Sequence, residues 1–219
     1  MTTRAAAVEV AVTHDATVTF ITPTYRRDGA ILSRTIHSVL VQTVASWRLL
    51  IISDGEEEKT PSELVRSIAD PRIEYMVCAS KGEGERASGN NVRQFGLERV
   101  RSRYVAFLDD DNIVFPDYVE VLSDALDRTP QVAMAIARII HLGPLPPSLH
   151  PPPKILDGNP PVPQNIDTLQ AMFRTPAMQE HGWLMRGYFA DGFTFESMAA
   201  TYGYTLVNAI VGVHMCDLR

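Results

Sequence analysis

The chain has 219 residues, of which 45% are apolar, and it carries a formal net charge of −6. This length suits one large domain with a substantial core. The negative charge supplies no basic footprint, so nucleic acid is not expected as a partner. Cys78 and Cys216 are too few for a disulfide scaffold or a four-cysteine zinc site, and we expect them to stay reduced in the cytoplasm.

Residues 1–15 predict a flexible N-terminal extension. Arg4, Glu9 and His14 interrupt its Ala- and Thr-rich stretch, so no continuous apolar segment of an export signal forms. No window of the chain approaches the ~18 apolar residues of a membrane-spanning helix. We therefore expect a cytoplasmic protein, and the sequence leaves room for a peripheral membrane contact.

Strands alternate with helices through the first half of the chain. Apolar runs predict strands over residues 18–21, 47–53, 73–77 and 104–108. Helical spacing or a Pro at the first turn predicts helices over residues 31–40, 61–68 and 86–101 and from Pro116 onward. This alternation predicts right-handed crossovers and one α/β domain with a mainly parallel central sheet flanked by helices.

The second half changes composition. A strand is predicted over residues 132–140, and a Pro-rich loop follows over residues 143–163. A short helix over 166–173, a longer helix over 191–202 and a final strand over 204–213 complete the expected elements. A loop this long in a compact domain is typical of a lid, a binding surface or a disordered segment.

Three consecutive carboxylates, Asp109, Asp110 and Asp111, directly follow the apolar run at residues 104–108. The carboxyl ends of strands in open α/β sheets face the ligand-binding crevice. Adjacent carboxylates repel one another unless donors or a cation compensate. Because side chains alternate in an extended chain, Asp109 and Asp111 point to one side, roughly 7 Å apart, and can straddle a hydrated cation and its ligand.

Three other acidic or His positions lie at predicted element ends. Asp54 follows the second strand, Asp191 begins a helix, and His214 follows the last strand. A parallel sheet gathers such ends along one edge, so these side chains are expected to share a crevice with the aspartate triplet.

Four ordered segments carry a resemblance to a known family. They are Val18–Tyr25, Ser38–Thr43, Leu49–Gly55 and Phe107–Asn112. Together they resemble the family-two glycosyltransferases, which are GT-A-fold enzymes that use nucleotide-diphosphate sugars. The similarity covers roughly residues 18–127 and thins beyond Arg128 to two short matches.

The resemblance implies a nucleotide pocket at the ends of the first two strands. It places Pro23 and Tyr25 beside the base and gives Asp54 the role of accepting a hydrogen bond from a pyrimidine N–H. An aromatic face that stacks and a carboxylate that reads a donor suit this role. An Asx turn with Gly55 is the structural alternative for Asp54, and core packing is the alternative for Tyr25.

In the family's DXD motif the middle acid meets the ribose and the last acid holds Mn²⁺ or Mg²⁺. These roles fall on Asp110 and Asp111, with Asp109 assisting at the metal. The metal would act as a Lewis acid toward the leaving diphosphate. A helix N-cap is the structural alternative, but a cap needs one carboxylate and not three.

Further family positions are implied less directly. Arg86 and Arg93 fall where family members carry an Arg that approaches the nucleotide, although the usual Arg-Asn pair is Arg93-Gln94 here; a solvated helix face explains either Arg as well. His214 falls where many GT-A enzymes place a C-terminal His on the metal or near the diphosphate. An exposed His near a chain end is the alternative.

Asp191 resembles the family's second acidic motif, with Ala190 replacing the usual preceding Glu. In inverting members this Asp is the base that deprotonates the acceptor hydroxyl. A helix N-cap is the alternative role, and Glu196 is a reserve base. Trp183 and the Gly187-Tyr188 pair are candidates for the acceptor pocket, with core packing as the alternative for Trp183.

The sequence thus predicts a metal-dependent, inverting glycosyltransferase with a donor half over residues 16–128 and an acceptor half over residues 129–219. A UDP-sugar is the favoured donor and a GDP-sugar the second choice, while the acceptor hydroxyl is not identified. A sugar-phosphate nucleotidyltransferase and a catalytically silent nucleotide-binding module remain alternatives. A homodimer is compatible with the sequence.

Overall fold

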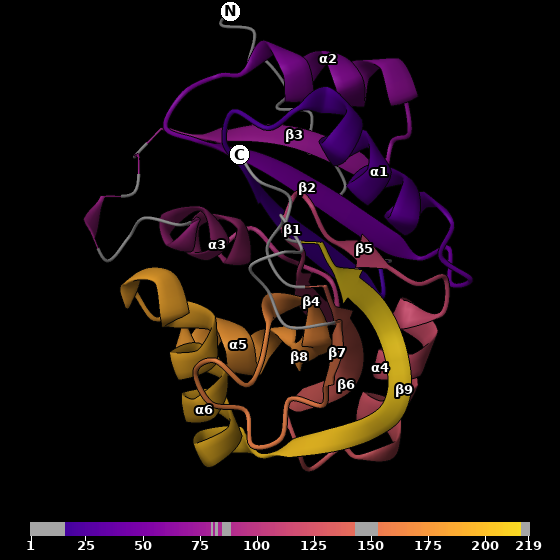
Figure 1. Ribbon diagram of the computed structural model, residues 1–219, viewed down its shortest axis with the longest axis vertical. Coiled ribbons are helices and arrows are strands. Elements are labelled where there is room, and N and C mark those ends of the chain that lie inside the picture. Colours follow the sequence, from indigo (N-terminus) through magenta and orange to yellow (C-terminus); the bar gives the residue numbers. More distant parts are fainter. Residues whose placement is uncertain (1–15, 80, 82, 85–88, 143–152, 216–219) are drawn as a thin grey trace, which may run out of the picture.

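The computed structural model of the protein describes residues 16–79, 81, 83–84, 89–142 and 153–215. Within them, nine strands form one sheet in the order β3-β2-β1-β4-β8-β6-β9-β5, with β7 paired to β6 (Figure 1). The strands are β1 (Val18–Thr24), β2 (Trp47–Asp54), β3 (Ile73–Cys78), β4 (Tyr104–Phe107), β5 (Ile113–Val114), β6 (Met134–His141), β7 (Lys154–Leu156), β8 (Ala171–Arg174) and β9 (Tyr204–His214).

Helices cover both faces of this sheet. The elements α1 (Gly29–Leu40), α2 (Lys59–Ile68) and α4 (Tyr118–Arg128) pack on one face, and α3 (Asn90–Leu97), α5 (Thr175–His181) and α6 (Ala190–Tyr202) pack on the other (Figure 1). Two short 3₁₀ turns, η3 (Thr168–Gln170) and η4 (Gly187–Phe189), precede β8 and α6. No helix among the described residues is long and apolar enough to cross a bilayer.

The predicted α/β class is confirmed, and the pairing β3-β2-β1-β4 is parallel throughout. Strand β8 then runs antiparallel to both β4 and β6, while β6 and β9 are parallel. The first four strands therefore end at a common edge, which is the geometry that binds ligands in open α/β sheets.

Alternating side chains of the central strands feed two separate cores. Phe20 packs toward α1 and α4, and the next residue, Ile21, packs toward α3. Both are fully buried. Strand β1 is therefore buried on both sides, including its three threonines.

Strand β9 carries His214 toward the aspartate triplet. It pairs with β6 along most of its length and then with β5, placing Val213 opposite Ile113. Figure 1 shows β9, in yellow, curving along the side of the sheet until it ends beside β5. Because β5 directly follows the aspartate triplet, this curve carries His214 back to the carboxyl edge of β4.

Several predicted elements need correction. The helix predicted over residues 86–101 ends at Leu97, where the Arg99 and Arg101 guanidinium groups donate to the last carbonyls, those of Phe95 and Glu98. The helix predicted over 166–173 is wrong beyond η3, because Ala171 to Arg174 form a strand between β4 and β6. The apolar spacing there reflects burial between strands and not a helical face.

The loop predicted over residues 143–163 contains strand β7, and its residues 143–152 lie outside the described part of the chain. The sequence also did not reveal β5 or α5. The predicted extension over residues 1–15 and the nucleotide-binding candidate Arg86 lie outside the described residues as well.

The end of the Pro-rich segment packs tightly against the start of α6. A Cβ atom at Gly192 would collide with the backbone of Pro163. Only a glycine lets these two segments approach so closely, and this contact fixes the helix turn that carries Asp191.

The substitution Gly192→Ala is expected to destabilise the fold by about 1–3 kcal/mol, because the backbone of Pro163 has to move. For a chain of this size, thermal unfolding should show a Tm lowered by about 2–12 °C. The control Glu196→Ala changes an exposed residue of the same helix and should leave the Tm nearly unchanged. Equal Tm values for both variants would contradict the tight contact.

Candidate active site

The predicted site residues gather at the carboxyl edge of the parallel strands. Strands β1 and β2 run in register up to Thr24 and Ser53, so Pro23 and Asp54 lie at neighbouring strand ends. Strand β4 pairs with the other side of β1 and ends just before the aspartate triplet. The sheet therefore brings the predicted nucleotide-binding and acidic residues to one edge, as the sequence predicted.

A buried arginine that the sequence did not indicate, Arg27, forms ion pairs with two of the three aspartates. The Arg27 guanidinium lies 2.7 Å from an oxygen of Asp110 and 3.0 Å from an oxygen of Asp111. The side chains of Arg27 and Asp110 are each only 4% exposed. The second oxygen of Asp110, Oδ2, is buried and has no hydrogen-bond partner in the described structure. A hydroxyl of a ligand would satisfy it.

Helix α1 also fixes the backbone of the acidic turn, which comprises residues 109–112. Arg34 donates to the carbonyl of Asp111 at 2.7 Å, and the Thr35 hydroxyl donates to the carbonyl of Asn112 at 2.9 Å. The Asn112 side chain in turn accepts from the backbone N–H of Met215, directly after His214, at 3.0 Å. The turn is therefore tied to both α1 and the end of β9.

The third aspartate has a different partner. Asp109 forms an ion pair with Arg93 of α3, whose guanidinium lies 5.1 Å from the ring centroid of Trp183. Gly89, with φ +76°, lets this arginine lie beside Pro23, because a Cβ there would approach both residues closely. Arg93 thus lies in the site, whereas Trp183 is only 4% exposed and belongs to the core and not to an open acceptor pocket.

His214 pairs with an acid that the sequence analysis missed. Its Nδ1 lies 2.8 Å from Oδ2 of Asp167, and its ring stacks on His141 with a centroid distance of 4.4 Å. Burial raises the pKa of Asp167, but the charge of His214 and its hydrogen bond outweigh burial and hold the pKa below its usual value. The pKa of His141 is lowered by burial and by the charge of His214.

Two further acids of the site, Asp111 and Asp191, have raised pKa values. Burial, the charge of Asp109 and the charge of Asp110 raise the pKa of Asp111 to about 6, although Arg27 and His214 oppose the shift. Burial and the charge of Asp167 raise the pKa of Asp191 to about 7. A carboxyl with a pKa near neutrality is suited to act as a general base. Glu196, by contrast, is exposed.

Tyr25 and Asp54, which are predicted to bind the nucleotide base, lie at the ends of β1 and β2. Lys81 donates from Nζ to the Tyr25 hydroxyl at 3.1 Å and lies 4.7 Å from the centre of that ring. The backbone after Asp54 turns at Gly55, with φ +94°, and its N–H donates to the carbonyl of Cys78. Tyr25 is only partly buried, so its ring is not ordinary core packing.

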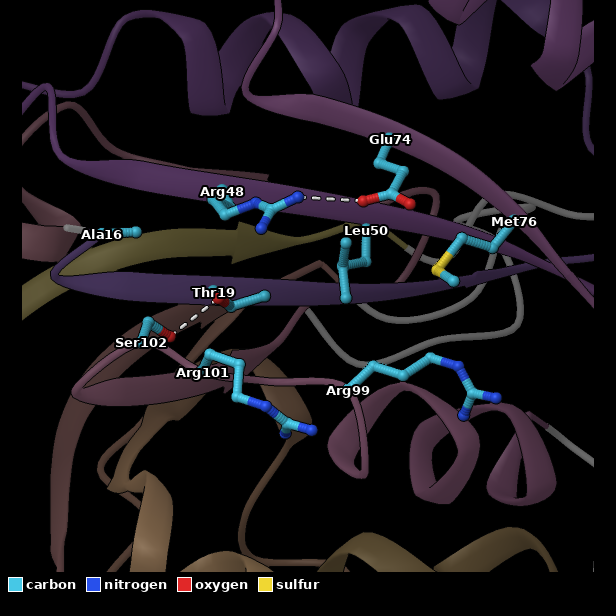
Figure 2. A pocket seen from close by; sticks show the side chains of 9 residues that line it. All are labelled: Ala16, Thr19, Arg48, Leu50, Glu74, Met76, Arg99, Arg101 and Ser102. Atoms are coloured by element: carbon cyan, nitrogen blue, oxygen red, sulfur yellow. Dashed lines mark hydrogen bonds and ion pairs between the residues drawn. The ribbon is translucent and has the colours of Figure 1, made fainter. Parts of the chain in front are cut away.

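Two cavities of the described structure lie at the opposite edge of the sheet. One, of about 270 Å³, is shown in Figure 2, where the Thr19 and Ser102 hydroxyls are joined at 2.7 Å and Arg48 pairs with Glu74. The other, of about 550 Å³, adjoins it through Arg101 and Ser102. Neither cavity is lined by a residue that the sequence predicted for the site.

Comparison with known proteins agrees with this geometry. Residues 19–190 match the model of Glycosyl transferase family 2. The chain belongs to this family.

A relative within the family has a defined activity. The UDP-Glc:alpha-D-GlcNAc-diphosphoundecaprenol beta-1,3-glucosyltransferase WfgD of Escherichia coli is 32% identical over 108 residues, which cover 49% of this chain and 40% of that protein. Among the curated relatives that match, the shared segment makes up from 12% to 40% of their length. The chain thus corresponds to less than half of each of these proteins.

Solved structures share the GT-A glycosyltransferase fold with the chain. Staphylococcus aureus TarS in complex with UDP-GlcNAc superposes with a TM-score of 0.68 at 10% identity, over 90% of this chain and 58% of that chain. The mannosyltransferase PcManGT from Pyrobaculum calidifontis, in complex with GDP-Man and Mn²⁺, gives a TM-score of 0.65 at 15% identity, over 92% and 57%.

The acidic edge suits a divalent cation in its chemistry. In the part of the chain that the structure describes, no three His, Cys, Asp or Glu side chains converge as a preformed metal centre. The carboxylates nevertheless outnumber the basic groups. The carboxylates are those of Asp109, Asp110, Asp111, Asp167 and Asp191, and the basic groups are Arg27, Arg34, Arg93 and His214. Carboxylate oxygens and an imidazole are ligands that Mn²⁺ accepts.

The contribution of Arg27 to stability can be tested by removing its charge. We expect Arg27→Met to destabilise the protein by about 3–5 kcal/mol, because Asp110 would stay buried without its partner. The Tm in metal-free buffer should fall by about 6–20 °C.

The matched control is Arg128→Met, which removes an exposed partner of Asp124 and should leave the Tm nearly unchanged. Adding Asp110→Asn to Arg27→Met should recover part of the loss. If the double variant is no more stable than Arg27→Met alone, the charge explanation is wrong.

Proposed function

We propose that the chain transfers a sugar from a nucleotide diphosphate to an acceptor hydroxyl with inversion, in a metal-dependent reaction. The observation that carries the proposal is the position of Asp191, whose pKa is raised to about 7 by burial and by its neighbours Asp167 and Asp109. The carboxyl of Asp191 lies close enough to Asp109 of the acidic turn for their charges to interact, which supports this role. Residues 16–128 would hold the donor and residues 129–219 the acceptor.

The donor nucleotide would bind along the ends of β1 and β2. Pro23 and Tyr25 would contact the base, and Asp54 would accept from a pyrimidine N–H, which favours a UDP-sugar over a GDP-sugar. TarS binds UDP-GlcNAc, while PcManGT binds GDP-Man, so the fold accommodates either base. The buried Oδ2 of Asp110 would accept from a ribose hydroxyl, and Arg86 and Arg93 would face the nucleotide.

Asp111, Asp109 and His214 would hold Mn²⁺ or Mg²⁺. When bound, the cation would supply Lewis-acid stabilisation of the departing nucleoside diphosphate. Arg27 would meanwhile hold the carboxylates of Asp110 and Asp111 in place, and Arg93 would do the same for Asp109. The chain would therefore present firmly held carboxylates to a cation.

Asp191 would act on the opposite reactant. Its carboxylate would take the proton of the acceptor hydroxyl while the oxygen attacks the anomeric carbon. Attack from the side opposite the leaving diphosphate inverts the configuration at that carbon. The contact between Gly192 and Pro163 would hold this base in place, and Ala190 in place of the usual Glu leaves Asp191 as the acid of this motif.

The acceptor would be a membrane-associated sugar. WfgD acts on a sugar carried by diphosphoundecaprenol, and a peripheral contact would let this chain reach such a substrate without spanning the bilayer. The nucleotidyltransferase alternative is less suited, because Thr22–Arg27 is not the Gly-rich loop that such enzymes place after the first strand. A homodimer would be compatible with the same chemistry.

Nucleotide binding can be tested by thermal unfolding. With Mn²⁺ and UDP at about 100 times its Kd, we expect stabilisation by about 2.7 kcal/mol and a Tm raised by about 5–11 °C. Asp111→Asn should lose the part of the shift that depends on Mn²⁺. The proposal fails if neither UDP nor GDP raises the Tm in the presence of metal.

Asp191→Asn should lower turnover by about 10²–10⁴-fold, since it removes a positioned general base. The nucleotide-induced Tm shift should persist, because Asp191 does not contact the donor base. In the unchanged protein, kcat/KM should rise with pH through about 7 and then level off, as Asp191 loses its proton. Glu196→Gln is the control and should keep full turnover; a silent binding module would show no turnover in any variant.

Asp191→Asn should also stabilise the folded protein at pH 8. Because the folded-state pKa of Asp191, about 7, lies above its ordinary value of 3.8, stability falls as pH rises between these values. At pH 8 the Asn variant should gain about 1–2 kcal/mol, discounted for partial solvent contact, and about 2–8 °C in Tm. At pH 4 the gain should vanish, and an equal gain at both pH values would contradict the raised pKa.

A further inference from the structure

Asp167 is a partly buried acid of the site, with 14% of its side chain exposed, to which the proposed reaction gives no task. Its two carboxylate oxygens have different partners. Oδ1 accepts from the backbone N–H of Leu169 at 3.0 Å, which caps the turn η3. Oδ2 faces Nδ1 of His214 at 2.8 Å. Capping requires only the first oxygen, so the second is available to act on the histidine.

The turn that carries Asp167 is held firmly. The Asp167 backbone N–H donates to Oε1 of Gln170 at 3.0 Å, which completes a capping box. The amide of Gln170 is fully buried and donates to the carbonyl of Ala137 in β6 at 3.0 Å. The next residue, Thr168, donates from its hydroxyl to Oδ2 of Asp109 at 3.3 Å. The position of the carboxylate is therefore fixed relative to the acidic turn.

The ring of His214 is restrained from a second side. His141 and His214 are register partners on the parallel strands β6 and β9. Their rings stack with an interplanar angle of 7°. The backbone N–H of Leu142 donates to the His214 carbonyl at 3.2 Å, which holds the two strand ends together. Stacking fixes the plane of the imidazole, and Asp167 fixes its rotation within that plane.

We infer that Asp167 is a positioning residue that holds His214 with its proton on Nδ1, so that Nε2 serves as the ligand of a divalent cation beside Asp111. This inference rests on the proposed function. An ionised carboxylate can only accept a hydrogen bond, so the nitrogen that faces it must carry hydrogen. A histidine that binds metal through one nitrogen commonly donates its other N–H to such a carboxylate. His214 lies close enough to Asp111 for the two charges to interact.

The substitution Asp167→Asn separates this role from the capping role. Asn is as good an N-cap as Asp, so the turn should persist. The new amide, however, can present N–H to the His214 Nδ1, which favours the opposite tautomer with hydrogen on Nε2. Asp124→Asn is the matched control, because it removes one exposed carboxylate on α4, whose ion-pair partner in the described part of the chain is its helix neighbour Arg128.

The tautomer can be measured without metal or substrate. In the full-length protein labelled with ¹⁵N-histidine, long-range ¹H–¹⁵N spectra at pH 8 should show His214 protonated at Nδ1, assigned by loss of the signal in His214→Gln. Asp167→Asn should move the proton to Nε2, while Asp124→Asn should leave it on Nδ1. An Nε2-protonated His214 in the unchanged protein would overturn the inference.

The consequence for binding is measured by titrating Mn²⁺ into protein saturated with UDP, following the free ion by electron paramagnetic resonance. Asp167→Asn should weaken Mn²⁺ affinity by about 10–100-fold, with unchanged far-UV circular dichroism, and Asp124→Asn should not. Affinity within about twofold of the unchanged protein would overturn the metal-ligand role. If the unchanged protein binds neither UDP nor Mn²⁺, the proposed function fails, while the tautomer measurement still decides the orienting role of Asp167.

Discussion

The structure depends on a balance of charge at one edge of the sheet. Five carboxylates, those of the aspartate triplet together with Asp167 and Asp191, lie near one another. The charges of Asp109 and Asp110 help to raise the pKa of Asp111, and those of Asp167 and Asp109 help to raise the pKa of Asp191. Arg27 and Arg93 offset only part of this charge, and both are largely buried. Groups so close in a poorly solvated place repel strongly, so the arrangement persists because the surrounding elements hold it rigidly.

The topology of the sheet supplies that rigidity. Parallel strands β1, β2 and β4 end together, which accounts for the nucleotide side and the aspartate triplet. The remaining groups arrive from far along the chain, because β8 lies between β4 and β6 and because β9 curves until it pairs with β5. Asp167 is delivered just before β8 and His214 at the end of β9. A purely parallel sheet would have left these two residues apart.

The sequence predicted the part of this arrangement that follows from local pattern. The strands that end in Asp54 and before the triplet are recognisable from their runs of apolar residues, and α6 is predicted at the correct place. Arg27 looked like any charged residue of a loop, since its burial depends on a partner 83 residues away, Asp110. Asp167 was hidden for a similar reason, because its helix-like apolar spacing belongs to a turn and a strand between two others.

Asp167 connects the two halves of the proposed reaction. Its negative charge attracts His214 on the side of the leaving group, and the same charge helps to raise the pKa of Asp191 on the side of the acceptor. A cation bound beside His214 would weaken the field of Asp167 at Asp191, and the basicity of that carboxylate would fall. In the proposed reaction, the basicity of Asp191 would therefore depend, through the charge of Asp167, on whether a cation is bound beside His214.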